Sequence, residues 1–305
     1  MQLRTLGKTN LQVSSIGMGC VTFGREIDQA TSLEILDRAL ECGINLFDTA
    51  EAYAKGASER VLGEWIKDRR CRDKIVLATK VSGVLSRERI LQSVDESLQR
   101  LQVDHIDLFQ LHVWDGTTPL EETMDALNTL VKSGKVRFVG SSNWSCWQLA
   151  KSLLLSQSQG LARIESVQPP YNLVEREIEA DLLPLCGDQQ VGVISYSPLA
   201  AGFLTGKYGR GDTIPKGTRF DVIPAHQPLY FTPRGYDVLS RLEKAAQQTG
   251  HSMVQLSLAW AMQQANVTSV LVGARNLSQV DQAFSAEQIE LDEDVMKLLT
   301  SPVIA

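Results

Sequence analysis

The sequence alternates between short apolar runs and longer stretches with the hydrophobic period of a helix, and this alternation repeats eight times. The runs are nearly continuous in apolar residues, which is typical of parallel strands buried on both faces of a sheet. Eight consecutive strand–helix units predict an α/β fold, a closed (β/α)8 TIM barrel. The apolar runs cover residues 13–20, 44–50, 74–81, 106–114, 136–143, 165–172, 191–199 and 268–274.

Three segments depart from the repeat. Residues 3–14 predict a β-hairpin around a Gly-Lys-Thr-Asn turn, placed to close the bottom of the barrel. Residues 200–233 are rich in Gly, Pro and aromatic residues and predict a long loop, of the kind that usually has a function. Residues 234–264 predict two helices before the last strand, one more than the repeat needs. Because no linker divides the chain, residues 1–305 are expected to form one barrel domain.

Composition and charge exclude several classes of protein. The 36 acidic residues exceed the 30 basic ones, giving a net charge of −6, and argue against a nucleic-acid partner. A run of about 18 apolar residues is absent, as is the pattern of a signal peptide, so we expect neither membrane association nor export. The five cysteines are widely spaced, and the histidines lack metal-ligand spacing. We therefore expect reduced thiols, a cytoplasmic location and no metal.

Polar residues close five successive apolar runs. In a barrel of this kind, the carboxyl ends of the strands meet at the mouth, where active sites lie. A single polar residue there has a structural explanation, such as a turn cap, but five at equivalent positions predict a site. A buried lysine is especially informative, because lysine is almost never fully buried without a partner. The five residues are Asp48, Lys80, His112, Asn143 and Gln168.

These side chains suggest a specific chemistry when Tyr53, five residues beyond Asp48, is added. Lys80 and Asp48 can form an ion pair, which offsets the cost of burying each charge. A lysine beside Tyr53 is expected to lower the phenol pKa toward the working range and so make it a proton donor. His112 can donate a hydrogen bond to a carbonyl oxygen. The reaction also needs a hydride, which implies a nicotinamide cofactor.

Over nearly its whole length the chain resembles the aldo-keto reductases. The resemblance implies that Tyr53 is the general acid, that Lys80 and Asp48 tune it, and that His112 polarises and orients the carbonyl. The matching motifs are NLFDTAEAYAKGASERVLG (45–63), IVLATK (75–80), IDLFQLH (106–112), GKVRFVGSSNW (134–144), VQPPYNL (167–173) and YSPLAAGFLTGKY (196–208).

The same resemblance implies a set of cofactor-binding residues. The nicotinamide carboxamide would be held by Ser142, Asn143 and Gln168, and its ring would stack on Tyr196. The end of the first strand, the segment after Tyr196 and the segment after the last strand would hold the rest of the cofactor. These further residues are Gly19, Cys20, Val21, Ser197, Pro198, Leu199, Gly202, Leu204, Lys207, Gly273, Arg275 and Gln279.

Arg275 favours NADP(H) over NAD(H), because a planar guanidinium suits the oxygens of a 2′-phosphate. Two positions depart from the family pattern: Ala274 stands where many members have Ser or Thr, and Ala283 stands where many have Asn. Structural explanations stay open for several residues. Tyr196 could cover the barrel rim, Lys207 could be a solvated charge, and Arg275 could cap the last helix or pair with Asp281.

Substrate-binding residues are sought among the aromatic side chains of the loops, although such residues also serve to anchor a loop. The candidates are Trp114, Phe220, Tyr230 and Phe231. The expected function is NADP(H)-dependent reduction of a small aldehyde or ketone. Two alternatives remain: a nucleotide-sensing regulatory subunit, since the resemblance extends to potassium-channel β subunits, and a sugar or polyol dehydrogenase working in the oxidative direction. A monomer or weak homo-oligomer is expected.

Overall fold

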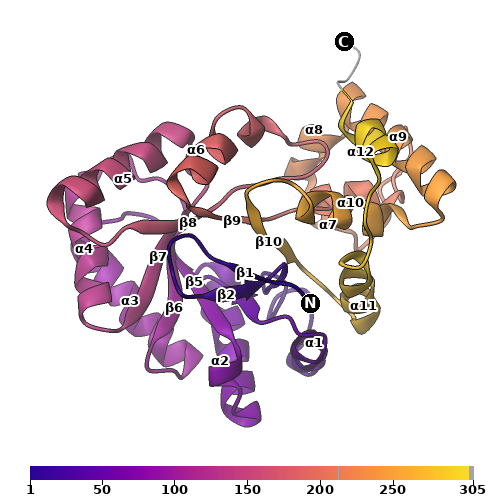
Figure 1. Ribbon diagram of the computed structural model, residues 1–305. Coiled ribbons are helices and arrows are strands. Elements are labelled where there is room, and N and C mark those ends of the chain that lie inside the picture. Colours follow the sequence, from indigo (N-terminus) through magenta and orange to yellow (C-terminus); the bar gives the residue numbers. More distant parts are fainter. Residues whose placement is uncertain (212, 302–305) are drawn as a thin grey trace.

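The computed structural model describes residues 1–211 and 213–301, and within them eight parallel strands close a barrel in the order β10-β3-β4-β5-β6-β7-β8-β9 (Figure 1). The predicted (β/α)8 barrel is therefore confirmed, and each of the eight apolar runs contains one strand or most of it. The strands are β3 (Ile16–Gly19), β4 (Leu46–Asp48), β5 (Val76–Val81), β6 (Ile106–Leu111), β7 (Val136–Ser142), β8 (Ile164–Gln168), β9 (Gly192–Ser195) and β10 (Val267–Val272).

Helices surround the barrel and cover the outer faces of its strands (Figure 1). Their starts follow ordinary capping rules: Asp28 accepts a hydrogen bond from the Thr31 amide before α1, and Ser86 accepts one from the Arg89 amide before α3. The layer consists of α1 (Gln29–Glu41), α2 (Ala57–Arg69), α3 (Arg87–Leu101), α4 (Leu120–Lys132), α5 (Cys146–Gln159), α6 (Leu182–Gln189) and α11 (Leu277–Ala286), and α12 (Glu293–Thr300) packs farther out against α9.

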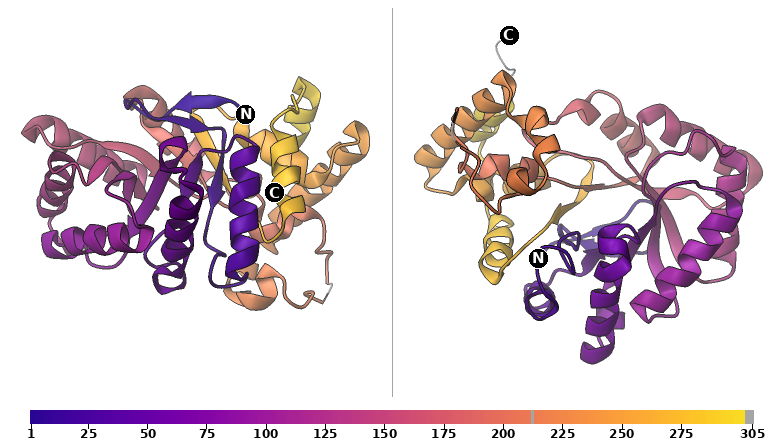
Figure 2. Two further views of the ribbon diagram at one scale, coloured as in Figure 1. Left: turned by 90° about the horizontal axis from the view of Figure 1, so that it is seen from below. Right: turned by 180° about the vertical axis from the view of Figure 1, so that it is seen from behind.

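The N-terminal hairpin closes one end of the barrel, as predicted. Its strands are β1 (Leu3–Thr5) and β2 (Gln12–Ser14), which pair antiparallel. Leu6, Leu11 and Val13 pack in one buried cluster with apolar side chains of the strands. A Cβ on Gly192, at the start of β9, would lie 2.4 Å from Cδ1 of Leu6 and 3.0 Å from the amide nitrogen of Gly7, so a larger residue there would force the hairpin to shift. Figure 2 (left) shows this hairpin and the segment around residues 200–230 at opposite ends of the barrel.

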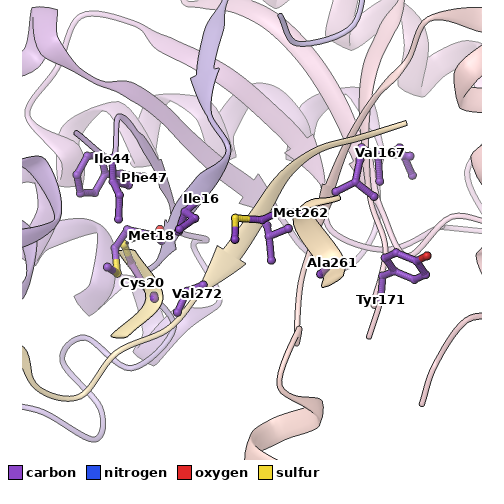
Figure 3. Packing of buried hydrophobic residues seen from close by; sticks show 14 of the residues in the cluster. Ile16, Met18, Cys20, Ile44, Phe47, Val167, Tyr171, Ala261, Met262 and Val272 are labelled. Carbon is purple, nitrogen blue, oxygen red and sulfur yellow. Dashed lines mark hydrogen bonds between the residues drawn. The ribbon is translucent and has the colours of Figure 1, made fainter. Parts of the chain in front are cut away.

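The larger core lies between the strands and the helix layer. Ile16 and Met18 of β3 contribute to it together with Phe47 of β4 and Val272 of β10 (Figure 3). Such burial of apolar surface contributes about 25 cal/mol per Å² to folding. The barrel strands thus supply apolar side chains on both faces: Phe47 and Leu77 belong to the larger core, and Leu46 and Ala78 belong to the cluster under the hairpin.

The segment predicted as a loop at 200–233 contains several short helices: η4 (Ala200–Thr205), α7 (Arg219–Val222), η5 (Pro224–His226) and α8 (Gln227–Tyr230). Two longer helices, α9 (Pro233–Thr249) and α10 (Met253–Met262), then precede β10, as predicted. The hydrophobic period could not predict these helices, because each is only one or two turns long and too short to show an amphipathic repeat.

Within residues 1–211 and 213–301, no helix is long and apolar enough to cross a membrane. The five cysteines are free thiols.

Candidate active site

A cavity of about 480 Å³ opens at the carboxyl ends of the barrel strands, the end opposite the hairpin. Its size is that of a small-molecule or cofactor site. Asp48, Tyr53 and His112 line it, and Lys80 lies directly behind Asp48. The structure therefore brings together the four residues for which the sequence predicted a joint chemical role.

Asp48 and Lys80 form an ion pair in the barrel interior. Lys80 is fully buried and Asp48 is 2% exposed, and the Lys80 ammonium donates to Oδ1 of Asp48 and, at 2.9 Å, to the carbonyl oxygen of Thr49. Burial alone would lower the pKa of Lys80, but the charges of Asp48 and Tyr53 and the hydrogen bonds to both together outweigh burial and raise that pKa above its ordinary value. Lys80 is thus a permanent cation at the base of the cavity.

Two glutamines hold the other oxygen of Asp48. The side-chain amides of Gln110 and Gln168 each donate to Oδ2 at 3.0 Å. Gln168 also donates to the side-chain oxygen of Gln110 at 3.2 Å. Every buried oxygen of the carboxylate therefore has a donor, which a buried charge requires. Gln110 has no predicted role, although its position two residues before His112 on β6 places it on the same inward face.

Tyr53 begins η1 (Tyr53–Gly56), directly after β4, and its phenol oxygen lies 3.4 Å from the Lys80 ammonium. Ala54 and Lys55 have left-handed backbone conformations, with φ of 49° and 54°, which turn the chain back toward α2. Burial raises the pKa of Tyr53 above its ordinary value, and Lys80 opposes this rise. The prediction that the pKa of Tyr53 is lowered overall is thus wrong, because desolvation outweighs the lysine charge.

His112 follows β6 and faces Tyr53 across the mouth, with ring centroids 5.8 Å apart in an edge-to-face arrangement. Its Nδ1 atom lies 2.9 Å from the hydroxyl oxygen of Ser82, the residue after β5. Burial, assisted by the charge of Lys80, lowers the pKa of His112 to about 4. His112 is therefore neutral at physiological pH.

Asn143 and Tyr196 form the next side of the cavity. Asn143 has a φ of 57°, a left-handed conformation that asparagine tolerates well. Its amide donates to the His112 carbonyl oxygen at 2.9 Å, and its Oδ1 accepts a hydrogen bond of 2.8 Å from the Tyr196 hydroxyl. Burial raises the pKa of Tyr196 to about 12. Ser142 donates to the carbonyl oxygen of Gln168 at 2.8 Å, which fixes the ends of β7 and β8.

The segment after Tyr196 contains a cluster of left-handed residues that lie against the cavity. Ser197, Ala201 and Gly202 line it, with φ of 55°, 56° and 94°. Successive amides in such conformations can form a concave anion-binding nest. The Lys207 ammonium lies only 3.5 Å from where a Cβ of Gly202 would stand. Leu204, by contrast, is fully buried in the core and is not among the cavity-lining residues described.

The end of β10 and the start of α11 complete the cavity. Gly273, Arg275 and Gln279 line it, and Gln279 accepts a hydrogen bond of 2.8 Å from the Arg275 amide. The Arg275 guanidinium donates to the carbonyl oxygen of Gly217 at 2.9 Å. The suggested partner Asp281 is paired instead with Arg38.

Arg219 is a cavity residue that sequence reasoning missed. It lies on α7 and donates to Glu26 at 3.1 Å. Burial and the neighbouring guanidinium groups of Arg25 and Arg275 lower the pKa of Arg219, and Glu26 partly offsets this. The sequence could have pointed to it, since Arg219 is a charged residue in the long 200–233 segment expected over the mouth of the barrel. That the Arg219 side chain lies near Arg275 could not be predicted without knowing the conformation of this segment.

Further lining residues were also not predicted. Most belong to the neighbours of predicted residues or to α10 and α11. They are Thr22, Thr205, His226, Val254, Leu258, Leu271, Val272 and Gln282. Ala283, which departs from the family pattern, also lines the cavity.

The aromatic residues predicted to bind substrate lie elsewhere in this conformation. Tyr230 and Phe231 pack on Phe203, and Phe220 packs on both of them. Tyr230 also donates to Glu175 at 2.6 Å. They form the interior of the 200–233 segment and are not among the described residues that line the cavity. They anchor the loop, which was the stated alternative.

Trp114 lies outside the described cavity lining as well. It makes edge-to-face contacts with Trp144 and Trp147, at centroid distances of 4.9 and 5.5 Å. Because Trp114 follows His112 by two residues, this cluster stands at the rim of the mouth. Among the described residues, no group of His, Cys, Asp and Glu side chains could hold a metal ion.

Comparison with known proteins identifies the class of protein. The model of the aldo/keto reductase family matches residues 15–303. The uncharacterized oxidoreductase YrpG of Bacillus subtilis (strain 168) is 33% identical, over 98% of this chain and 95% of its own. The chain therefore belongs to the aldo/keto reductase family, which confirms the resemblance drawn from its motifs, and these relatives support an oxidoreductase.

Two other relatives differ in what their names state. The aldo-keto reductase YhdN of Bacillus subtilis (strain 168) is 35% identical, over 92% of this chain and 87% of its own. A probable voltage-gated potassium channel subunit beta of Arabidopsis thaliana is also 35% identical, over 100% of this chain and 94% of its own. The chain is therefore equally similar in sequence to a protein named as an aldo-keto reductase and to one named as a potassium channel subunit.

Proposed function

We propose that this protein is an NADP(H)-dependent oxidoreductase that reduces aldehydes or ketones to alcohols. The observation that carries the proposal is the contact between Tyr53, a neutral phenol at the cavity, and Lys80, a cation held behind it by Asp48. A proton donor beside a fixed positive charge suits a reaction in which negative charge develops on a carbonyl oxygen.

Each residue of the site has a separate role in the proposed reaction. Tyr53 donates its proton to the carbonyl oxygen, and Lys80 stabilises the phenolate that remains. The raised pKa of Tyr53 keeps the proton in place until that oxygen becomes basic. His112, neutral and 5.8 Å from the Tyr53 ring between centroids, orients the carbonyl by a hydrogen bond. A bound nicotinamide supplies the hydride, which no side chain can deliver.

The cavity residues fit such a cofactor. Because Gln168 directs its amide nitrogen to Asp48, its Oε1 atom is left to accept a hydrogen bond from the carboxamide, and Ser142 and Asn143 lie beside it. Tyr196 offers an aromatic face. The left-handed residues Ser197 and Ala200 to Gly202 and the Lys207 ammonium suit a pyrophosphate, because backbone amides and an ammonium both present positive charge to an anion.

Arg275 and Arg219 support NADP(H) rather than NAD(H). Their guanidinium groups line the same end of the cavity and repel each other, and Arg25 lies close by. Glu26 offsets part of this charge. A 2′-phosphate would offset the rest and accept hydrogen bonds from planar donors. A cytoplasmic location fits the free thiols and the cofactor pool, and the expected partner is a small carbonyl compound.

Fluorescence titration of the purified protein with NADPH and with NADH tests the cofactor. Absorbance at the reduced-nicotinamide band with a panel of aldehydes and ketones then tests the reaction. Tighter binding of NADPH, followed by oxidation with some carbonyl compound, is the expected result. Failure to bind either nucleotide would refute the proposal.

The similarity to a potassium channel β subunit supports a second candidate, a nucleotide-sensing regulatory subunit with little turnover. Tight NADPH binding without turnover on any carbonyl or alcohol would favour it. Faster turnover with alcohols and NADP⁺ than with carbonyls and NADPH would instead favour a sugar or polyol dehydrogenase. The presence of Tyr53, Lys80, Asp48 and His112 together favours the reductase.

A further inference from the structure

Ser82 lies beside His112 because β5 and β6 are paired in register. Val81 pairs with Leu111, so the next residues of the two strands, Ser82 and His112, stand next to each other at the mouth. The His112 amide donates to the Val81 carbonyl oxygen at 2.9 Å and continues this register. The Ser82 hydroxyl then lies 2.9 Å from Nδ1 of His112.

A second set of contacts fixes the backbone of Ser82. Its amide donates to Oε1 of Glu51 at 2.8 Å. Glu51 in turn pairs with Arg89 and accepts a hydrogen bond of 2.6 Å from Ser93, both on α3. Glu51 is thus tied to the helix layer, and Ser82 is held against the imidazole by more than its own side chain.

The direction of the Ser82–His112 hydrogen bond decides what the imidazole can do. A neutral histidine carries one N–H group, and the partner of one ring nitrogen sets which nitrogen holds the proton. If Nδ1 donated, Nε2 would be an acceptor and could not bind a carbonyl oxygen. Within the described chain, Ser82 Oγ makes no other hydrogen bond that would use its hydrogen. Donation from Ser82 to Nδ1 therefore satisfies both groups.

We propose that Ser82 is a positioning residue that donates its hydroxyl hydrogen to Nδ1 of His112 and so keeps the imidazole proton on Nε2. Nε2 then presents an N–H donor to the carbonyl oxygen of a substrate. This inference rests on the proposed carbonyl reduction for its catalytic consequence, but the position of the proton is a property of the protein alone.

Nitrogen-15 NMR of the full-length protein measures that property directly. Histidine-labelled protein, with the His112 signals identified by their loss in His112→Gln, should show Nε2 bearing hydrogen and Nδ1 bare. In Ser82→Ala the two nitrogens should average toward a mixture of tautomers. A protonated Nδ1 in the unaltered protein would overturn the proposal without any variant being needed.

Kinetics of the same variants test the consequence. Ser82→Ala should lower kcat for the carbonyl substrate about tenfold, the effect of one lost hydrogen bond, and leave the NADPH Kd unchanged. Ser82→Thr, which keeps the hydroxyl, should restore both the rate and the NMR signature. The matched control is Ser86→Ala in the same loop, which removes the cap of α3 and should leave the His112 signals in place.

The outcomes separate this inference from the proposed function. Unchanged tautomer and rate in Ser82→Ala would contradict it, as would a changed tautomer with an unchanged rate. If the unaltered protein reduces no carbonyl at all but the tautomer depends on Ser82, the proposed function fails and the positioning of His112 stands.

Discussion

The ammonium of Lys80 lies 3.4 Å from the phenol oxygen of Tyr53, and the same ammonium is bound to Asp48 on its other side. Lys80 therefore joins the buried carboxylate to the group exposed in the cavity. A change in any one of the three alters the electrostatics of the other two.

Replacing Tyr53 by phenylalanine removes the proposed acid and leaves the ring. We expect kcat to fall by roughly 10² to 10⁴, the usual contribution of general acid catalysis, with the NADPH Kd nearly unchanged. Stopped-flow absorbance and fluorescence titration measure the two quantities. Tyr236→Phe, which removes a hydroxyl outside the described cavity lining, is the control, and a near-normal rate in Tyr53→Phe would show that the acid has been misassigned.

Replacing Lys80 by methionine leaves Asp48 buried without its cation. We expect the free energy of unfolding to fall by about 3 kcal/mol or more, because a buried charge that loses its partner is strongly destabilising. Urea unfolding followed by circular dichroism measures this change. The double variant Asp48→Asn/Lys80→Met should recover part of the loss, whereas equal losses in both variants would mean that the unpaired Asp48 carboxylate is not the source of the loss.

The low pKa of His112 predicts a pH dependence of stability. The folded protein holds this pKa at about 4, compared with 6.5 for a free histidine. Between these values the unfolded chain binds a proton that the folded chain does not, so stability falls as the pH is lowered from about 6.5 to about 4. The shift corresponds to at most about 3.4 kcal/mol, at about 1.4 kcal/mol for each pKa unit.

The difference between the unaltered protein and His112→Gln isolates this contribution. Unfolding free energies at several pH values should show a weaker dependence between pH 6.5 and 4 in the variant. His251→Gln, in the connection between α9 and α10, is the control for loss of a histidine elsewhere. Parallel pH curves for the unaltered protein and His112→Gln would contradict the assignment.

Replacing Arg275 by alanine should weaken NADPH binding more than NADH binding. Hydrogen bonds to charged groups contribute about 1.5–3 kcal/mol, so we expect the NADPH Kd to rise by about tenfold or more. Arg219→Ala should act in the same direction. Lys244→Ala removes an exposed charge on α9 and controls for net charge. Equal losses of affinity for both nucleotides would remove the 2′-phosphate assignment.

The sequence predicts the barrel well because each strand and its helix have distinct hydrophobic periods. It also predicts which residues meet at the mouth, since topology places the ends of parallel strands together. Gln110 and Ser82 were missed although they obey the same rule, because an isolated Gln or Ser next to an apolar run has many ordinary explanations. The structure shows how the strands align, and this alignment places Ser82 beside His112 and Gln110 beside Asp48.

Two kinds of property depend on three-dimensional detail that no pattern contains. The pKa of Tyr53 is set by the balance of burial against the charge of Lys80, and only coordinates show that burial is the larger effect. The aromatic residues Phe220, Tyr230 and Phe231 turn inward because packing on one another buries more apolar surface than lining an open mouth. Arg219 faces the cavity for the complementary reason, since its charge stays partly solvated there.

The hairpin that closes the opposite end of the barrel has a consequence for the order of events. Leu6, Leu11 and Val13 fill that end, so in the proposed reaction the nucleotide and the carbonyl compound would both enter through the cavity at the carboxyl ends of the strands. The partner seated deeper has to arrive first and leave last. The proposed reaction would then bind its two reactants in a fixed order, and product-inhibition patterns would show which of them binds first.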